Sequence, residues 1–136
     1  PLALIMLDVD AFKSYNDFYG HQPGDNCLRS IANILQRGAR RPSDLAARYG
    51  GEEFAFITCV KNSEEALALA EKLRQQIEQL AIPHELSSIG IVTASIGVAM
   101  LIPDDSNSIE QLIERADKAL YRAKERGRNR VELAQD

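Results

Sequence analysis

The feature that most constrains the fold of this chain is the near-continuous apolar run at its start, from Leu2 to Val9. A strand with one face in water alternates apolar and polar residues, whereas this run is apolar at both parities apart from Asp8. It therefore predicts a strand that is covered on both faces. The run ends in Asp8-Val9-Asp10, so carboxylates follow directly on a buried strand.

Helical and strand patterns alternate along the rest of the chain. Their order, strand–helix–helix–strand–strand–helix–strand–helix–strand, predicts an α+β or α/β sandwich around one sheet. After the first strand we expect a helix through Phe12 and Tyr15 that is broken at Gly20, Pro23 and Gly24, and then a helix from Asp25. Strands are expected at 45–49 and 54–60, followed by a helix that Ser63 caps and that ends before Pro83. The last three elements are a strand at 89–101 with a bulge at Gly97, a helix with a Ser108–Gln111 capping box that closes at Gly127, and a strand at 130–133.

Length, net charge and cysteine positions limit the kinds of protein to which this chain can belong. A chain of 136 residues suits a single domain, which we expect to span 1–136. The net charge of -4 gives no reason to expect binding to a nucleic-acid polymer or contact with an anionic membrane. No apolar run has the length of a membrane span. Cys27 and Cys59 lie in apolar segments without metal-ligand spacing, and we expect buried free thiols in a cytoplasmic protein.

The carboxylates after the first strand have two interpretations each. Asp8 is placed where a buried strand delivers a side chain to the sheet edge, and it is either a functional ligand or a solvated strand end. Asp10 is expected to cap the helix that follows. These two residues alone do not favour a catalytic site over a structural one.

The turn Gly50-Gly51-Glu52-Glu53 adds a second acidic pair between two expected strands. Paired glycines predict a hairpin, because they adopt the positive φ angles of tight turns. Adjacent carboxylates repel each other unless solvent or a cation relieves them, and Mg²⁺ takes one or two carboxylates together with substrate phosphates. The alternative is an exposed acidic turn.

Three blocks of residues resemble the GGDEF family of diguanylate cyclases and cover nearly the whole chain. The segment 48–54, Arg-Tyr-Gly-Gly-Glu-Glu-Phe, is similar to the family signature in its GGEEF form. The other two blocks are Leu7-Asp8-Val9-Asp10-Ala11-Phe12-Lys13 with Asn16-Asp17, Gly20-His21 and Gly24-Asp25, and Ala116-Asp117, Ala119-Leu120-Tyr121, Ala123-Lys124 and Gly127-Arg128-Asn129. The resemblance implies a palm-like central mixed sheet flanked by helices, similar to nucleotide cyclases and polymerase palms.

The resemblance also implies a metal-dependent reaction that joins two GTP molecules into cyclic di-GMP. Asp8, the carbonyl of Val9 and Glu52, assisted by Glu53, would hold two Mg²⁺ or Mn²⁺ ions in each half-site. Such ions activate a 3′-hydroxyl and stabilise charge on the α-phosphate and the leaving pyrophosphate. Glu52 is compatible both with a metal ligand and with a general base.

Other matching positions imply substrate contacts. Asn16 and Asp25 match the guanine-binding pair, since a carboxylate accepts both from N1–H and from the N2 amino group of guanine. Asp25 also suits a helix cap after Gly24, and both roles can hold at once. Phosphate contacts are implied for Phe12, Lys13, Gly50, Gly51, Lys124 and Arg128, although Lys124 and Arg128 also suit the basic end of a helix.

Arg41-Pro42-Ser43-Asp44 fits the RxxD pattern five residues before Gly50. In the family this motif is the inhibitory site for the product, where arginine and aspartate contact the guanine edges. The alternative is a loop salt bridge. His21 and His84 have no second metal-ligand partner at a useful spacing, and we interpret His84 as a loop residue.

Each domain would hold one GTP, so the resemblance implies an antiparallel homodimer. Members of the family usually carry a further helix and an Asp-x-Leu-Thr segment before the first strand, and this chain begins after them. We expect any sensor region, or a membrane anchor of the parent protein, to lie outside the chain. A catalytically silent domain that binds GTP or cyclic di-GMP is the alternative function.

Overall fold

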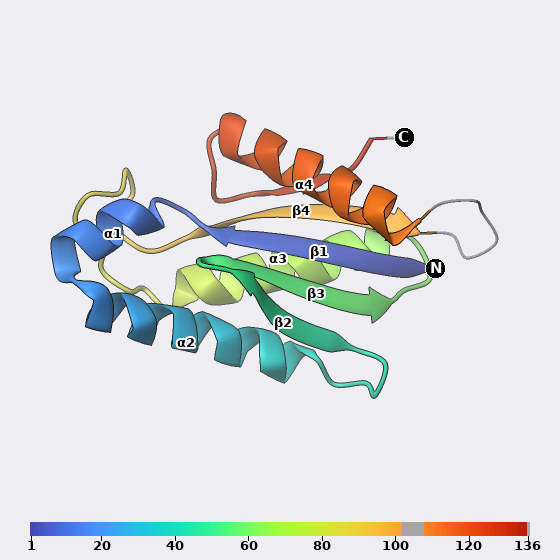
Figure 1. The fold of residues 1–136 in the computed structure, drawn as a ribbon, viewed down its shortest axis with the longest axis horizontal. Coiled ribbons are helices and arrows are strands. Elements are labelled where there is room, and N and C mark those ends of the chain that lie inside the picture. Colours follow the sequence, from blue (N-terminus) through green and yellow to red (C-terminus); the bar gives the residue numbers. More distant parts are fainter. Residues whose placement is uncertain (102–107, 136) are drawn as a thin grey trace.

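The computed structural model describes residues 1–101 and 108–135. The chain forms a sheet with helices on both of its faces (Figure 1). In chain order the elements are β1 (Leu2–Val9), α1 (Phe12–Tyr19), α2 (His21–Gly38), β2 (Leu45–Gly50), β3 (Glu53–Cys59), α3 (Ser63–Gln79), β4 (Ala94–Leu101), α4 (Ile109–Glu125) and β5 (Val131–Leu133).

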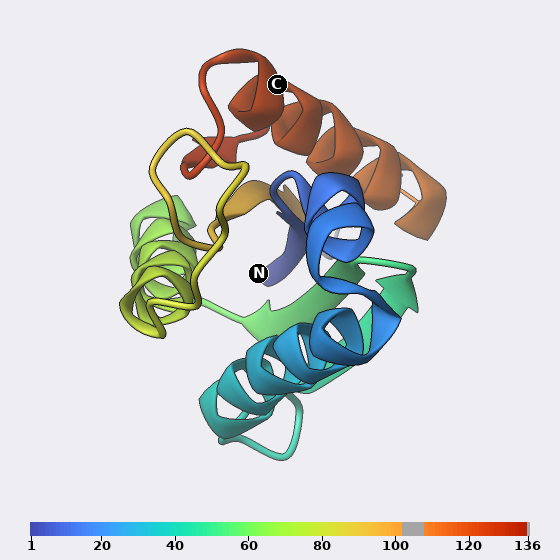
Figure 2. The same cartoon turned by 90° about the vertical axis from the view of Figure 1, so that its left-hand side faces the viewer.

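The apolar run at the start of the chain is the central strand of the sheet. The strand order is β2-β3-β1-β4-β5. Strand β1 pairs antiparallel with both β3 and β4, while β4 and β5 run parallel, so the sheet is mixed. Helices α2 and α3 lie on one face and α4 lies on the other, as the end-on view in Figure 2 shows. This confirms the predicted mixed sheet between helices.

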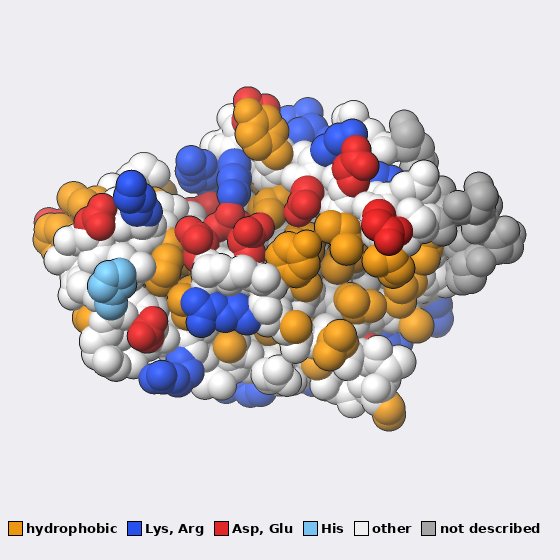
Figure 3. All heavy atoms as spheres, in the orientation of Figure 1, with side chains coloured by type: hydrophobic (Ala, Val, Ile, Leu, Met, Phe, Trp, Pro, Cys, Tyr) orange, Lys and Arg blue, Asp and Glu red, His pale blue; other side chains and the backbone are white. Residues whose placement is uncertain are grey.

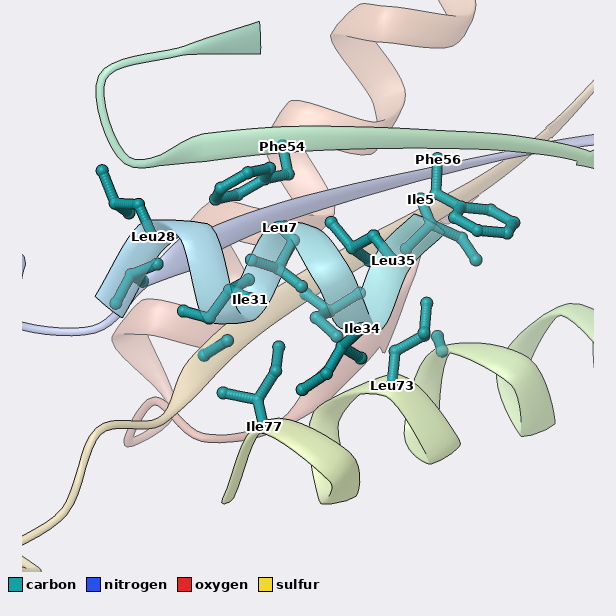
Figure 4. Packing of buried hydrophobic residues seen from close by; sticks show 14 of the residues in the cluster. Ile5, Leu7, Leu28, Ile31, Ile34, Leu35, Phe54, Phe56, Leu73 and Ile77 are labelled. Atoms are coloured by element: carbon teal, nitrogen blue, oxygen red, sulfur yellow. The ribbon is translucent and has the colours of Figure 1, made fainter. Parts of the chain in front are cut away.

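Two clusters of apolar side chains, one on each face, hold the layers together. On the face of α2 and α3, side chains of odd position in β1 pack with both phenylalanines of β3 and with the helices (Figure 4). On the face of α4, Leu4 and Met6 pack against Leu112, Ala116 and Leu120. Strand β1 is buried on both faces because it contributes side chains to both clusters.

Gly97 lets α4 lie close to the sheet. A Cβ atom at this position would overlap the backbone of Ala116 and Leu120. The predicted bulge at Gly97 is wrong, because Gly97 pairs in regular register with Met6. The physical reason for this glycine is therefore the approach of a helix backbone and not an irregular strand.

Several element ends differ from the sequence-based prediction. Helix α2 begins at His21 and includes Pro23, because an N–H in the first turn of a helix has no partner within the helix and its loss there is tolerated. Asn62, not Ser63, caps α3, with its side chain accepting from the Glu65 N–H at 2.9 Å. The capping box of Ser108 and Gln111 is confirmed.

The strand predicted at 89–101 and the buried thiol predicted at Cys59 also need correction. Strand β4 begins at Ala94, and Ile91 makes only an isolated bridge with Pro83. Cys59 is exposed at the end of β3, whereas Cys27 is buried as expected. Within the described residues, no helix combines the length and apolar character that crossing a membrane requires.

Candidate active site

The acidic residues of the first strand and of the glycine turn meet at one end of the sheet. Asp8 is the cross-strand partner of Glu53 in the pairing of β1 with β3. Directly opposite residues in an antiparallel pair have Cβ atoms about 4.5–5.5 Å apart. The N–H of Val9 donates to the carbonyl of Glu52 at 3.2 Å, so the backbone of the turn is tied to the end of β1.

Several carboxylates lie close together at this end of the sheet. Burial raises the pKa of Asp8, and the charges of Glu52 and Asp10 raise it further against the effect of Lys124. Burial also raises the pKa of Glu53, and the charges of Asp8 and Asp117 add to that effect. Figure 3 shows acidic side chains gathered at this end of the sheet, with basic side chains beside them. Ionisation of the cluster is therefore costly unless a cation lies nearby.

Lys124 on α4 supplies one such cation. Its Nζ forms an ion pair with Oδ2 of Asp8, whose side chain is only 12% exposed. The pair joins the last turn of α4 to the end of β1. Of the residues predicted for the phosphates, Lys124 thus lies in direct contact with a predicted metal ligand.

The donor set suits a hard divalent ion that also binds substrate. Carboxylate oxygens are the ligands that Mg²⁺ prefers, and Mg²⁺ sites in nucleotide enzymes take only one or two carboxylates, with substrate phosphates supplying others. Across residues 1–101 and 108–135, no three His, Cys, Asp or Glu side chains form a group that could hold a metal ion by themselves. The residues fit a site completed by a phosphate-bearing substrate.

The glycine turn is a hairpin, as predicted, but its glycines lack the positive φ angles that were expected of them. Strands β2 and β3 are separated only by Gly51 and Glu52, and neither Gly50 nor Gly51 has a positive φ angle. A Cβ at Gly51 would meet no atom within 4 Å, so there is open space beside the turn. Arg48 fixes the turn, since its guanidinium donates to the Gly51 carbonyl at 2.6 and 2.9 Å.

Asp10 does not cap the following helix, so that prediction is wrong. Its carboxylate accepts from the hydroxyls of Thr93 at 2.8 Å and Ser95 at 2.6 Å. It also accepts from the backbone N–H of Asn129 at 3.0 Å. Asp10 therefore ties the end of β1 to β4 and to the loop after α4, which no local sequence pattern indicates.

Helix α1 begins without a side-chain cap. Its N-cap is Ala11, which has a left-handed backbone conformation, and its first turn carries no acidic residue. The N–H groups of a helix start that lack caps favour an anion such as a phosphate. Phe12 is buried at this start, whereas Lys13 is exposed and makes no ion pair with the described residues.

Asn16 and the start of α2 form a second part of the site. The side-chain oxygen of Asn16 is buried, lies against Gly24 and has no hydrogen-bond partner among the described residues. Asp25 is exposed inside the first turns of α2, so its predicted role as a helix cap is wrong. It lines a cavity of about 520 Å³ with Leu28, Arg48 and Phe54.

Arg128 lies in a loop that three consecutive positive φ angles shape, at 122° for Gly127, 63° for Arg128 and 47° for Asn129. The N–H of Arg128 donates to the Ala123 carbonyl at 2.9 Å, which closes α4 as predicted for Gly127. The Arg128 side chain is exposed, and no contact with the acidic cluster is among its described interactions.

Arg41 and Asp44 lie together at the opposite end of β3 from the glycine turn. The Arg41 guanidinium donates to the Thr58 hydroxyl at 2.5 Å and to the Cys59 carbonyl at 2.6 Å, and Thr58 donates to Asp44 at 2.7 Å. Burial works to raise the pKa of Asp44, but the hydrogen bonds and the charge of Arg41 outweigh it and lower the pKa. The predicted loop salt bridge is present, with a separation of 3.6 Å.

Two further residues near the acidic cluster have no role in the sequence-based prediction. Arg48 holds the turn, and Asp117 lies two helical turns before Lys124 on α4. Burial raises the pKa of Asp117, and the charge of Lys124 opposes that effect. The seven-residue spacing of Asp117 and Lys124 is the available signal, because it places both on one helix face.

Comparisons with known proteins agree with this arrangement. A family model described as "Diguanylate cyclase, GGDEF domain" matches residues 1–130. Diguanylate cyclase VdcA of Vibrio cholerae is 49% identical over 132 residues, which cover 96% of this chain and 38% of that protein. Diguanylate cyclase A of Treponema denticola is 43% identical over 135 residues, which cover 99% of this chain and 36% of that protein. The chain thus spans little more than a third of these relatives.

Solved structures show the same fold. The GGDEF domain of DgcB from Caulobacter crescentus in complex with c-di-GMP matches with a TM-score of 0.87 and 38% identity, over 99% of this chain and 78% of that one. The active GGEEF domain of a diguanylate cyclase from Vibrio cholerae matches with a TM-score of 0.81 and 32% identity, over 99% and 83%. The expected palm-like fold is confirmed, and the chain belongs to the GGDEF family of diguanylate cyclase domains.

Proposed function

We propose that this domain condenses two GTP molecules into cyclic di-GMP with release of two pyrophosphates. The observation that carries the proposal is the pairing of Asp8 with Glu53 at the glycine turn, with Lys124 in contact with Asp8. An acidic cluster, a free helix start and a lysine at one end of a sheet suit a metal-bound triphosphate. The names of the relatives support the same activity.

In this proposal Asp8, the Val9 carbonyl and Glu52, with Glu53 beside them, hold two Mg²⁺ or Mn²⁺ ions. When bound, the ions polarise the α-phosphate and lower the pKa of the attacking 3′-hydroxyl. The raised pKa values of Asp8 and Glu53 support this role, since a cation removes the repulsion that raises them.

The triphosphate would be held by residues from three elements. Phe12 and Lys13 lie at the start of α1. Gly50 and Gly51 lie at the turn, where Gly51 leaves open space. Lys124 and Arg128 come from the end of α4 and the loop after it. Lys124 would leave Asp8 for a phosphate oxygen. The positive charges of Lys13, Lys124 and Arg128 would offset the negative charge of the triphosphate and of the leaving pyrophosphate.

Asn16 and Asp25 would read the guanine base. The Asn16 oxygen is buried without a partner among the described residues, so it can accept a hydrogen bond from a ligand. Asp25 faces a cavity and can accept from both N1–H and the N2 amino group of guanine. Adenine lacks the N1 donor, so it would leave the carboxylate unpaired.

The reaction needs two copies of the domain, each with one GTP. In each half-reaction the 3′-oxygen of one GTP forms a bond with the α-phosphorus of the other, and the bond to the pyrophosphate breaks. The proton of the hydroxyl passes to Glu52 or to solvent. Repeating the step in the opposite sense closes the ring, so we infer an antiparallel homodimer as the active form.

We also propose that Arg41 and Asp44 bind the product and inhibit the enzyme. The GGDEF domain of DgcB was solved in complex with c-di-GMP, which supports binding of this dinucleotide within the family. The Arg41–Thr58–Asp44 network already orients both side chains at the edge of a cavity of about 280 Å³. A catalytically silent sensor would use this site alone and would have no need of the acidic cluster.

The test is incubation of the chain with GTP and Mg²⁺, followed by chromatography for cyclic di-GMP and pyrophosphate. The Glu52→Ala variant should lose about a hundredfold or more of the activity, as removal of a group that stabilises the transition state does. Glu64→Ala, which removes an exposed carboxylate from the start of α3, is the matched control and should keep it. Full turnover by the Glu52→Ala variant would refute the assignment.

A further inference from the structure

His84 is buried, and it contacts the start of α1. Its side chain is 1% exposed, and its Nε2 lies 3.0 Å from the carbonyl oxygen of Ala11. Because a carbonyl only accepts, Nε2 carries the proton and donates it. His84 lies in a loop, as predicted, but the loop folds inward and packs the His84 ring against Tyr15, with ring centroids 5.2 Å apart.

Ala11 needs such support. Its φ of 52° and ψ of 37° are left-handed, a conformation that residues with a Cβ rarely adopt and that persists where the surroundings enforce it. The carbonyl of Ala11 also accepts from the Tyr15 N–H at 3.1 Å and the Ser14 hydroxyl at 2.9 Å, both inside α1. His84 is the donor that comes from outside the helix.

The conformation of Ala11 sets how α1 leaves β1. Ala11 lies between Asp10, which β4 and the loop after α4 hold, and Phe12, the first residue of α1. A change at Ala11 would therefore reorient the first N–H groups of α1 and the backbone of Lys13 relative to the end of β1. These are the groups that the proposed function assigns to the triphosphate.

We propose that His84 is a positioning residue, which holds the left-handed turn at Ala11 and so aims the start of α1 at the triphosphate of GTP. The inference rests on the proposed function for the identity of the ligand. It does not require His84 to contact substrate or to change its protonation. The ring acts through one hydrogen bond and through packing on Tyr15.

Two variants separate the hydrogen bond from the packing. His84→Phe keeps a ring against Tyr15 but removes the donor, while His84→Gln keeps an N–H at a similar distance from the backbone. Tyr19→Phe is the matched control, since the Tyr19 hydroxyl accepts from the Glu85 N–H at 2.9 Å and so fastens the same loop without touching Ala11.

Calorimetry with Mg²⁺ and a GTP analogue that has a methylene bridge between the α- and β-phosphates measures binding without turnover. We expect His84→Phe to bind about five- to tenfold more weakly, which is the worth of one net hydrogen bond, and His84→Gln to recover most of that loss. Tyr19→Phe should bind like the wild type. Equal losses in all three variants, or no loss in His84→Phe, would overturn the proposal.

A second measurement does not depend on nucleotide. Amide hydrogen exchange at Tyr15, whose N–H donates to Ala11, should be faster in His84→Phe than in His84→Gln or Tyr19→Phe, because the turn at Ala11 loosens. If the wild type fails to bind the analogue, the proposed function fails while this difference in exchange still tests His84. Unchanged exchange in His84→Phe would contradict the positioning role.

Discussion

Lys124 on α4 forms an ion pair with Asp8 at the end of β1, and thereby joins two residues that lie near opposite ends of the chain. Asp8 is largely buried, and burial raises its pKa. In the ligand-free domain the lysine offsets part of the negative charge of the acidic cluster. We expect Lys124 to exchange this partner for a phosphate oxygen when GTP and a metal ion bind.

Replacing Lys124 by Met should therefore have two separable effects. Without Mg²⁺ the domain should lose about 1 kcal/mol of unfolding free energy, since a partly buried carboxylate loses its partner. With Mg²⁺, affinity for the GTP analogue should fall at least about tenfold, because a charge-assisted contact with phosphate is lost. Urea denaturation in chelator and calorimetry measure the two effects.

Lys118→Met is the matched control for that experiment. Lys118 pairs with Glu114 on the exposed face of the same helix, at 3.1 Å. Such surface pairs contribute little, so both measurements should stay close to wild type. The assignment of Lys124 fails if the two methionine variants behave alike.

Gly24→Ala should weaken guanine binding without unfolding the domain. A Cβ at Gly24 would overlap the side-chain oxygen of Asn16, which must then move from its place. Alanine is the better helix former, by up to about 1 kcal/mol, which offsets part of the cost of moving Asn16, so thermal stability should fall only slightly. We expect GTP affinity to fall several-fold, measured by calorimetry. Unchanged affinity would remove Asn16 from the guanine site.

Local patterns placed the acidic residues in the fold, and the family resemblance supplied their predicted roles. Asp8 ends a buried strand, and Glu52 and Glu53 follow two glycines in a hairpin. The end of a buried strand and a tight turn each fix where the next side chain lies. The cross-strand register that brings Asp8 opposite Glu53 could not be predicted in this way, because β1 is apolar at both parities.

Residues whose partners are distant in the chain could not be placed. Asp10 resembled a helix cap, but its acceptors are satisfied by Thr93, Ser95 and Asn129. His84 has its partner in Ala11. The predictions at two glycines were wrong for a similar reason. Glycine is selected both where a helix or strand is irregular and where a neighbouring segment comes close. Gly24 and Gly97 are glycines of the second kind, which only tertiary contacts reveal.

Gly97→Ala should be among the most destabilising substitutions in the domain. The added Cβ would overlap backbone atoms of Ala116 and Leu120, which cannot move without shifting α4 from the sheet. Overpacking of this kind costs about 1–3 kcal/mol or more. Chemical denaturation should show the loss, and Gly51→Ala, where the new Cβ meets no atom, should not. A small effect would mean that α4 is less closely packed than in the structure.

Asp44→Asn should lower the unfolding free energy in a manner that depends on pH. The variant loses charge-assisted hydrogen bonds to Thr58 and Arg41, which contribute about 1 kcal/mol. The pKa of Asp44 lies below its ordinary value of 3.8 in the folded domain, so the folded state binds its proton less readily than the unfolded one. The advantage of the wild type is therefore fully present above that value and disappears as the pH falls through the lowered pKa. Denaturation from pH 7 to pH 3 measures the difference, with Asp17→Asn, an exposed carboxylate on α1, as the control. A difference that grows on acidification would contradict the assignment.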